Sequence, residues 1–222
     1  MELVKIHIEK RLKDLVPKIQ LLCVEVEVKV GKSSEQFWKE QVEKHVNKIR
    51  KKIQLKDIAA IPTNHATREA YKLCGKDPSR YRPSAEALLR RVVYGKSLYH
   101  VNNVVDILNL ISITSGFSIG GFDLDKTKGK IRLDIGDASS YDAIGRGELN
   151  IEYMPALRDN VGFFGTPTSD STRTMITTST KRFLMVFYDF YGEFNLEKTI
   201  RLTADLLIRY AHSPNFFYTI CQ

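Results

Sequence analysis

Apolar and polar residues alternate with a period of two in four segments of the chain. These segments are residues 4–8, 24–30, 131–135 and 149–153. Because successive side chains of a strand point to opposite faces, this alternation predicts half-buried β-strands. Residues 183–188 are apolar without interruption, which is typical of a strand that is buried on both faces.

Apolar residues spaced three and four positions apart indicate helices in much of the remaining chain. The predicted helices cover residues 33–53, 62–74, 84–94, 98–111 and 195–212. Ser33 and Gln36 fit a capping box at the start of the first helix, and Asn195 opens the last one. Helices and strands are mixed along a chain that has no repeat and no flexible linker. We therefore expect a single domain, residues 1–222, with an α/β fold of the α+β type.

Residues 76–83 form an arginine-rich connection between two of the predicted helices. Two prolines lie in this segment, and each disfavours the α conformation of the residue before it, so we expect an ordered but irregular loop. The loop carries Arg80 and Arg82. These arginines either hold the loop by pairing with Glu86 or with backbone carbonyls, or they contact a ligand.

Three polar residues recur on one face of the predicted helix 98–111. They are Asn102, Asp106 and Asn109, whereas Val101 begins the apolar stripe of the same helix. A polar stripe of this kind is normally solvated. In an otherwise apolar helix it is also consistent with a hydrogen-bonded, half-buried row beside a pocket.

The composition is that of a globular protein. The 222 residues are 43% hydrophobic, and 34 Lys and Arg against 26 Asp and Glu give a net charge of +8. A chain of this length buries a core without disulfides. The longest uncharged, apolar-leaning run, residues 107–122, is too short and too polar to span a membrane, and the N-terminus lacks the apolar core of a signal peptide. We expect a cytoplasmic protein with no membrane partner.

Cysteine and histidine positions give no metal signal. Cys23, Cys74 and Cys221 are far apart, and the five histidines lack the spacing of a helical metal site. We expect reduced, buried cysteines and no bound metal. The chain also lacks a phosphate-binding loop, a Rossmann glycine fingerprint and a nucleophile elbow. These absences argue against nucleotide hydrolysis and nicotinamide chemistry, and we expect no cofactor.

Basic residues are concentrated in the N-terminal half of the chain. Residues 1–100 carry a net charge of +10 and residues 101–222 a net charge of −2, which suits a polyanionic partner. The candidate phosphate contacts are Lys48, Arg50, Lys51, Lys52, Arg90, Arg91 and Lys96. The alternative is that these cations keep the protein soluble and stabilise helix C-termini.

The segment with the most suggestive chemistry is residues 162–173. Small and hydroxyl residues, including Thr168, Ser169 and Ser171, surround Asp170 after a short apolar strand. Their amides and hydroxyls could face an anion or a developing oxyanion, and Asp170 could orient water or bind an ammonium group. The alternative is a turn that such residues stabilise through their own hydrogen bonds.

A second glycine-rich stretch, residues 116–123, follows the helix that carries the asparagines. Its pair Gly120 and Gly121 permits close backbone approach to a ligand. By itself this signal is weak, because glycine pairs occur in many turns.

Several of these segments resemble a known family when they are taken in order. The three that carry the resemblance most clearly are 101–109 (VNNVVDILN), 116–125 (GFSIGGFDLD) and 128–132 (KGKIR). They are similar to the B-three/B-four module of the phenylalanyl-tRNA synthetase beta subunit. The segments 164–169, 180–184 and 68–91 extend the resemblance, which covers residues 68–190 and includes the free-standing relatives of that module.

The resemblance implies a fold, a reaction and a set of site residues. The fold is a layered mixed sheet with flanking helices, and the reaction is hydrolysis of tRNA that carries the wrong amino acid, chiefly tyrosine. The residues that match the family's helix, loop and pocket segments are Asn109, Phe122, Asp123, Gly165, Ser169 and Thr180. Asp170 lies near the family's tyrosine-sensing glutamate. A family histidine falls at Gly120, so a group that helps position the terminal adenosine or water is absent there.

Three functions compete on this basis. The first is a free-standing aminoacyl-tRNA deacylase, in which Asp170 orients water or senses the substrate while Thr168 and Ser171 donate hydrogen bonds. Its expected substrate contacts are Asn109, Gly120, Gly121, Asp123, Gly165, Ser169, Arg173, Arg80 and Arg82. The second is a module that binds tRNA or another RNA without cleaving it, and the third is a small-molecule or protein-interaction module. Nothing in the chain supports aminoacylation itself.

Overall fold

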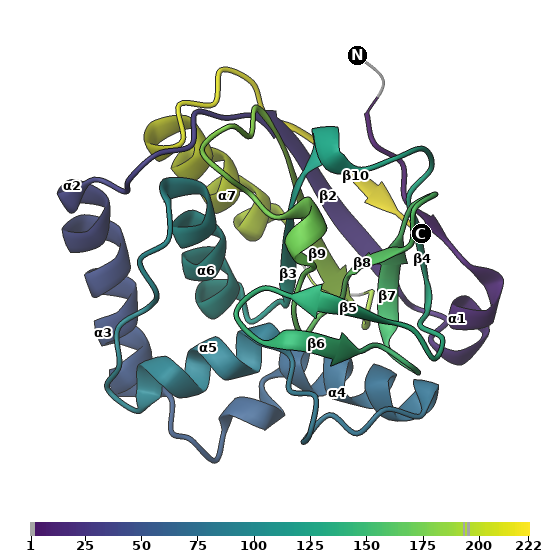
Figure 1. The fold of residues 1–222 in the computed structure, drawn as a ribbon. Coiled ribbons are helices and arrows are strands. Elements are labelled where there is room, and N and C mark those ends of the chain that lie inside the picture. The colour runs from purple at the N-terminus through teal and green to yellow at the C-terminus, as the bar shows by residue number, and fades with distance from the viewer. Residues whose placement is uncertain (1–2, 193, 195) are drawn as a thin grey trace.

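The centre of the molecule is a four-stranded antiparallel sheet in the order β10-β2-β9-β3 (Figure 1). Its strands are β2 (Gln20–Glu27), β3 (Ile119–Asp123), β9 (Arg182–Asp189) and β10 (Phe217–Cys221). The computed structural model describes residues 3–192, 194 and 196–222. β2 and β9 pair over their full length, with Gln20 opposite Asp189 and Glu27 opposite Arg182. β2 and β9 are therefore the two inner strands of the central sheet.

A second sheet packs on one face of the central sheet. Its order is β1-β4-β7-β8, with β1 (His7–Ile8), β4 (Arg132–Ile135), β7 (Pro155–Arg158) and β8 (Phe163–Gly165). β1 runs parallel to β4, and the other pairs are antiparallel. A separate hairpin of β5 (Ser140–Ala143) and β6 (Gly147–Asn150) lies beside β8 (Figure 1).

Most of the helices cover the opposite face of the central sheet. The helices are α1 (Lys10–Leu15), α2 (Glu35–Phe37), α3 (Glu43–Lys52), α4 (Pro62–Cys74), α5 (Ser84–Val93), α6 (Asn103–Ser115) and α7 (Glu197–Tyr210). A short π-helical turn (Trp38–Val42) joins α2 to α3, and 3-10 turns occupy Ile58–Ala60, Leu124–Lys126 and Thr172–Thr174. α6 lies between α5 and α7, whereas α1 and α4 lie toward the second sheet (Figure 1).

Alternating strand residues divide the core into two layers. Leu22 and Val24 of β2 pack with the helices, while Leu21 and Cys23 pack with the second sheet. β9 divides its buried residues between the same two layers, so it is apolar without interruption. The prediction of a buried strand at 183–188 and the α+β class are therefore confirmed.

Several predicted boundaries were wrong. Only His7–Ile8 of residues 4–8 is a strand, and β2 covers Gln20–Glu27 rather than 24–30. The strand expected at 149–153 ends at Asn150, and Tyr153 adopts a positive φ of 63° in the turn that follows. β7 and β10 had not been predicted, because their sequences, PALR and FYTIC, do not alternate between apolar and polar residues.

The helix expected at 98–111 is also displaced along the sequence. α6 begins at Asn103 because the Asn102 side chain accepts a hydrogen bond from the Val105 N–H, and it ends before Gly116, which is left-handed. Val101 therefore lies outside the helix and is 60% exposed.

Two predicted helix starts had different outcomes. The cap of α2 is Ser34, which accepts a hydrogen bond from the Phe37 N–H, and not Ser33. Asn195, the predicted start of the last helix, lies outside the described residues. The described part of that helix is α7, from Glu197 to Tyr210.

The cysteines are buried and free, as the sequence predicted. Within the described part of the chain, no three metal-binding side chains lie together in the arrangement that a metal ion needs. None of the helices formed by these residues is long and apolar enough to cross a bilayer.

Candidate functional site

The residues of segment 162–173 are held by hydrogen bonds within the segment and to three tyrosines outside it. The Thr168 hydroxyl lies 2.8 Å from the Tyr71 hydroxyl and donates to the Tyr81 carbonyl at 3.2 Å. The Ser169 carbonyl accepts from the Tyr141 hydroxyl at 2.6 Å and from the Thr166 hydroxyl at 2.9 Å. Thr168 is buried, and in this conformation its hydroxyl is fully engaged in the contacts that hold the segment in place.

Ser171 and Arg173 are also held within the fold. The Ser171 hydroxyl accepts from the Arg173 N–H at 3.2 Å and caps a 3-10 turn. The Arg173 guanidinium makes two hydrogen bonds of 3.0 Å to buried Asp159. Burial alone would raise the pKa of Asp159, but the hydrogen bonds from Arg173 and three backbone N–H groups lower it overall. The charge of Arg173 is thus compensated internally, and its predicted contact with substrate stays a prediction.

Asp170 differs from its neighbours because one of its oxygens has no partner. Oδ2 accepts a hydrogen bond of 3.0 Å from the Gly121 N–H, whereas Oδ1 is buried with no hydrogen-bond partner among the described residues. Burial raises the pKa of Asp170 to about 8, against the opposing effect of the Gly121 hydrogen bond. The group is therefore mainly a neutral carboxylic acid at pH 7.

Two glycines make room for this carboxyl group. A Cβ atom placed on Gly120 of β3 or on Gly165 of β8 would lie 3.2 Å from Asp170 Oδ1 and 2.5 Å from the Phe122 ring. Asp170 thus joins the edge of the central sheet, through Gly121, to the edge of the second sheet, where its backbone bridges Gly165. Both glycines were predicted from the sequence, and the structure brings them together around Asp170.

The Phe122 ring explains why residue 120 is a glycine. The ring is fully buried and packs edge-on against Phe164, with centroids 5.0 Å apart. It occupies the space into which any side chain at position 120 would point. The histidine that the family resemblance places at Gly120 therefore cannot be accommodated while Phe122 keeps this position.

Of three other predicted pocket residues, Asp123 and Gly121 lie on β3 and have contacts within the fold. Asp123 accepts hydrogen bonds from the Thr180 hydroxyl at 2.7 Å and from the Asp125 N–H at 3.2 Å. Gly121 faces the helical layer, where a Cβ would lie 2.6 Å from Leu108. Asn109 is half-buried on α6. Their predicted contacts with substrate stay predictions.

The polar row of residues 102, 106 and 109 is partly explained by the start of α6. Asp106 is buried and accepts hydrogen bonds from the Ser33 hydroxyl at 2.6 Å and the Val101 N–H at 2.9 Å. Burial raises the pKa of Asp106, although both hydrogen bonds oppose this shift. Together with the Asn102 cap, Asp106 fixes the chain that enters the helix.

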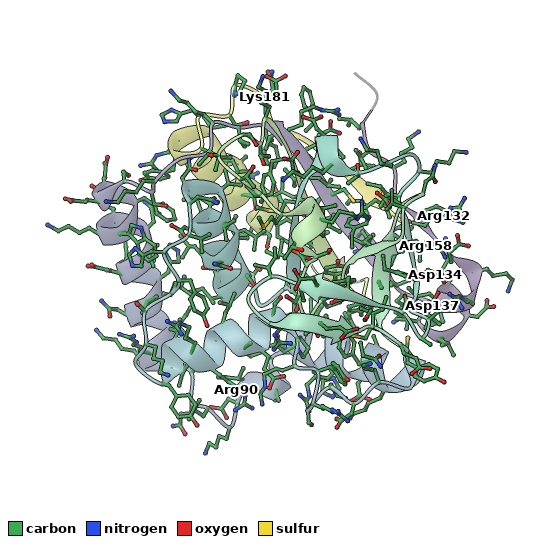
Figure 2. All side chains as sticks on the ribbon, in the orientation of Figure 1. Arg90, Arg132, Asp134, Asp137, Arg158 and Lys181 are labelled. Carbon is green, nitrogen blue, oxygen red and sulfur yellow. The ribbon has the colours of Figure 1, made fainter. Side chains whose placement is uncertain are left out.

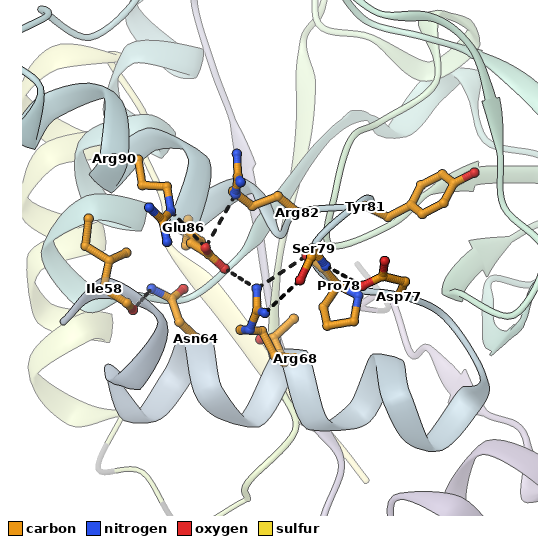
Figure 3. Close-up of polar contacts among 12 residues, drawn as sticks. Ile58, Asn64, Arg68, Asp77, Pro78, Ser79, Tyr81, Arg82, Glu86 and Arg90 are labelled. Atoms are coloured by element: carbon orange, nitrogen blue, oxygen red, sulfur yellow. Dashed lines mark hydrogen bonds and ion pairs between the residues drawn. The ribbon is translucent and has the colours of Figure 1, made fainter. Parts of the chain in front are cut away.

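A buried carboxylate holds three arginines on the side of the molecule formed by α4 and α5 (Figure 3). Glu86 is 1% exposed, and its oxygens lie 3.0 Å from Arg68, 3.4 Å from Arg82 and 2.9 Å from Arg90. Of the alternatives left open for the arginine-rich loop, the pairing of Arg82 with Glu86 is present in the structure. One negative charge faces three positive charges, so the cluster keeps a net charge of +2 and attracts anions.

A surface hollow of about 510 Å³ lies beside this cluster. Its lining residues are Arg82, Ala87, Arg90, Arg91, Tyr94 and Lys96. Residues 87–105 contain no Asp or Glu. Figure 2 places Arg90 far from Arg132 and Arg158, which lie on the second sheet. Four of the basic residues predicted from the sequence therefore line the hollow: Arg82, Arg90, Arg91 and Lys96.

Helix α3 adds a second basic segment to this face. Arg50 donates to the Val92 carbonyl at 2.9 Å and to the Lys96 carbonyl at 3.1 Å, which ties α3 to the end of α5. Residues 44–56 contain six Lys and Arg and no Asp or Glu. Lys48, Lys51 and Lys52 are exposed. We call this surface, formed by residues 44–56 and the hollow, the basic face.

Arg80 is the remaining predicted arginine, and three other residues of this surface had not been predicted. Arg80 is exposed, with its guanidinium 5.6 Å from the centre of the Tyr81 ring. Arg68 had not been predicted as part of the site, although it shares Glu86 with the other arginines. The exposed rings of Tyr94 and Tyr99 had not been predicted either. The spacing of Arg82, Glu86 and Arg90 by four residues is the signal that could have revealed the cluster.

Comparison with known proteins gives one family and one fold. Residues 66–211 match the sequence profile of the B3/4 domain. Among solved structures, the chain is similar to an N-terminal fragment of the phenylalanyl-tRNA synthetase beta-subunit from Pyrococcus horikoshii, with a TM-score of 0.53 and 13% identity. The match covers 100% of this chain and 55% of the fragment. No curated protein matches the chain. At this identity the structural likeness establishes the fold alone.

Proposed function

Because the chain belongs to the B3/4 domain family and shares its fold with a phenylalanyl-tRNA synthetase fragment, we propose that it binds tRNA. The chain spans about half of that fragment, 55%, so the activity of a whole synthetase is not carried over. The proposed interaction is with the phosphate backbone, which dominates the affinity of most proteins for nucleic acids.

The observation that carries this proposal is the basic face. Residues 44–56 and 87–105 contain no acidic side chain, and Arg50 holds the two segments together. Exposed lysines on α3 and the cations of the hollow can each neutralise a phosphate. The Glu86 cluster holds two of the hollow's arginines in place, which lowers the entropy lost on binding.

A binding measurement with matched charge reversals tests this proposal. We expect Lys48→Glu with Lys96→Glu to weaken tRNA binding at least tenfold, because each change removes a phosphate contact and adds a repulsion. Lys181→Glu is the control, since Lys181 is exposed and lies far from Arg90 in Figure 2. Equal affinity of both variants for tRNA, measured by filter retention or fluorescence anisotropy, would contradict the proposal.

The unpartnered oxygen of Asp170 supports a second candidate, hydrolysis of an aminoacyl ester on tRNA. An aminoacyl ester is already activated, so an enzyme mainly needs to hold a water molecule against the carbonyl and stabilise the oxyanion. Because its pKa is about 8, only the ionised fraction of the Asp170 carboxyl group could accept a proton from that water, and the buried oxygen Oδ1 would first have to be opened to it. The hydroxyls of Thr168 and Ser171 would have to leave their present partners to take part.

Release of tyrosine from a phenylalanine-specific tRNA tests this candidate, with correctly charged tRNA as the comparison. We expect Asp170→Asn to abolish the release, because the amide cannot accept the proton. Asp142→Asn, a change at an exposed carboxylate of β5, should leave the release unchanged. Equal release by the Asp170→Asn variant and by the unaltered protein would remove Asp170 from the mechanism.

A further inference from the structure

The segment that follows α5 exposes aromatic rings beside the basic hollow. Tyr94, at the end of α5, is 68% exposed and lines the hollow itself. Tyr99, five residues later, is 52% exposed. Tyr94 lines the hollow and Tyr99 packs on Arg91, another residue of its lining, so the two exposed rings lie on the same surface.

The ring of Tyr99 is held in place by a neighbouring cation. The Arg91 guanidinium lies 3.9 Å from the ring centre, and its Nε donates to the Ser97 carbonyl at 2.6 Å. Arg91 therefore covers one face of the ring, which leaves surface available on the other. A ring that is fixed before binding loses little conformational entropy when a flat ligand stacks on it.

One stacked ring pair lies between this segment and the turn that precedes α3. His100 is exposed and stacks on Trp38, with centroids 3.6 Å apart and planes 15° apart. The segment between Tyr94 and His100 thus presents rings at its two ends and contains Lys96 between them. No acidic side chain occurs from residue 87 to residue 105.

Cations alternating with exposed rings match the two chemical parts of an unpaired nucleotide. The phosphate pairs with Lys or Arg, and the base stacks on a ring. We infer that unpaired nucleotides of an RNA bind across this segment, with bases stacking on Tyr94 and Tyr99 and phosphates contacting Lys96 and the arginines of the hollow. This inference rests on the proposed function and specifies which part of the RNA this surface holds.

The chemistry of the rings favours unpaired nucleotides over a duplex. In an A-form duplex the bases stack on one another, and the deep, narrow major groove excludes side chains. Lysine and arginine alone would suit either form of RNA, because both carry phosphates. The two tyrosines are therefore the residues that would discriminate between paired and unpaired RNA.

The experiment compares three RNAs at one moderate salt concentration: an unstructured A-rich 12-mer, a blunt-ended duplex of 12 base pairs, and tRNA. The full chain is tested alongside the double variants Tyr94→Ala/Tyr99→Ala and Tyr94→Phe/Tyr99→Phe. Tyr218→Ala is the matched control, because Tyr218 is 48% exposed on β10. Circular dichroism establishes that each variant is folded.

We expect the double alanine variant to bind the 12-mer at least about tenfold more weakly and the duplex with unchanged affinity. The phenylalanine variant should bind as the unaltered protein does, since stacking needs the ring and not the hydroxyl. Equal loss for both RNAs, no loss for the 12-mer, or failure of the 12-mer to bind while tRNA binds would overturn the inference. If none of the three RNAs binds, the proposed function itself fails.

Discussion

Asp170 is the residue whose physical state most depends on the fold around it. Its backbone belongs to the edge of the second sheet, and its side chain reaches the Gly121 N–H on the central sheet. The surrounding burial favours the neutral carboxylic acid, so the pKa rises to about 8. An unpaired oxygen in this position costs stability, which makes Asp170 a poor choice for a purely structural link.

Asp170 should make the stability of the protein fall as pH rises. Between pH 4 and 8 the folded state keeps a proton that the unfolded chain has lost, so the free energy of unfolding decreases by about 1.4 kcal/mol per pH unit from this group. The Asp170→Asn variant lacks this dependence. Its free energy of unfolding should therefore fall less steeply than that of the unaltered protein in urea denaturation at pH 5, 6 and 7. Parallel pH profiles would show that the carboxyl group is ionised in the folded state.

At the scale of single elements, α5 combines an apolar face and a charged face. Its apolar residues Leu88, Leu89 and Val92 are buried against the other helices. Its first turn places Glu86 where it can pair with arginines from α4, from the loop before α5 and from α5 itself. One carboxylate thus orients cations that would otherwise repel one another.

Removing this carboxylate should destabilise the protein. We expect Glu86→Gln to lower the free energy of unfolding by about 2 kcal/mol, because three arginines lose their shared partner. Their partial exposure lets water replace some of the lost interaction, which keeps the cost below that of a fully buried pair. Glu69→Gln removes an exposed pair with Lys72 and should cost less than about 0.5 kcal/mol in the same urea titration. Similar losses in the two variants would mean that the cluster adds little.

Strand β3 provides a second test at this scale. Gly120→Ala should lower the free energy of unfolding by about 1–3 kcal/mol, because the new Cβ would lie 2.5 Å from the Phe122 ring. Gly31→Ala is the control, since nothing lies within 4 Å of its added Cβ. Thermal unfolding of both variants measures the difference. Equal melting temperatures would show that Phe122 moves easily and that a larger residue fits at position 120.

Local patterns and tertiary contacts explain what the sequence could and could not reveal. The apolar run at 183–188 identified β9, because a strand buried on both faces has a clear signature. The partner of Arg173 is Asp159, and nothing in their spacing along the chain indicates the pair. Likewise, the environment of Asp170 depends on β3, which is 49 residues away in the sequence. The sequence thus indicated which residues are candidates for the site. It could not indicate their hydrogen-bond partners, because these depend on tertiary packing.

At the scale of the whole molecule, the basic residues are concentrated in one half of the sequence, and many of them lie on one surface of the fold. The first 100 residues carry a net charge of +10, and the fold brings two acid-free segments of this half into contact through Arg50. The second sheet, by contrast, mixes charges, since Asp134 of β4 lies on the same sheet as Arg132 and Arg158. A protein with this distribution presents one preferred face to a polyanion.

The salt dependence of tRNA affinity tests the central claim most directly, because each phosphate contact contributes a known increment to the slope of log K against log salt. Neutral substitutions give the cleanest count, so the double variant Lys48→Gln/Lys96→Gln is compared with Lys181→Gln and with the unaltered protein. We expect the slope of the double variant to be smaller in magnitude by about 2, with the control unchanged. Identical slopes for all three proteins would contradict binding of tRNA at the basic face.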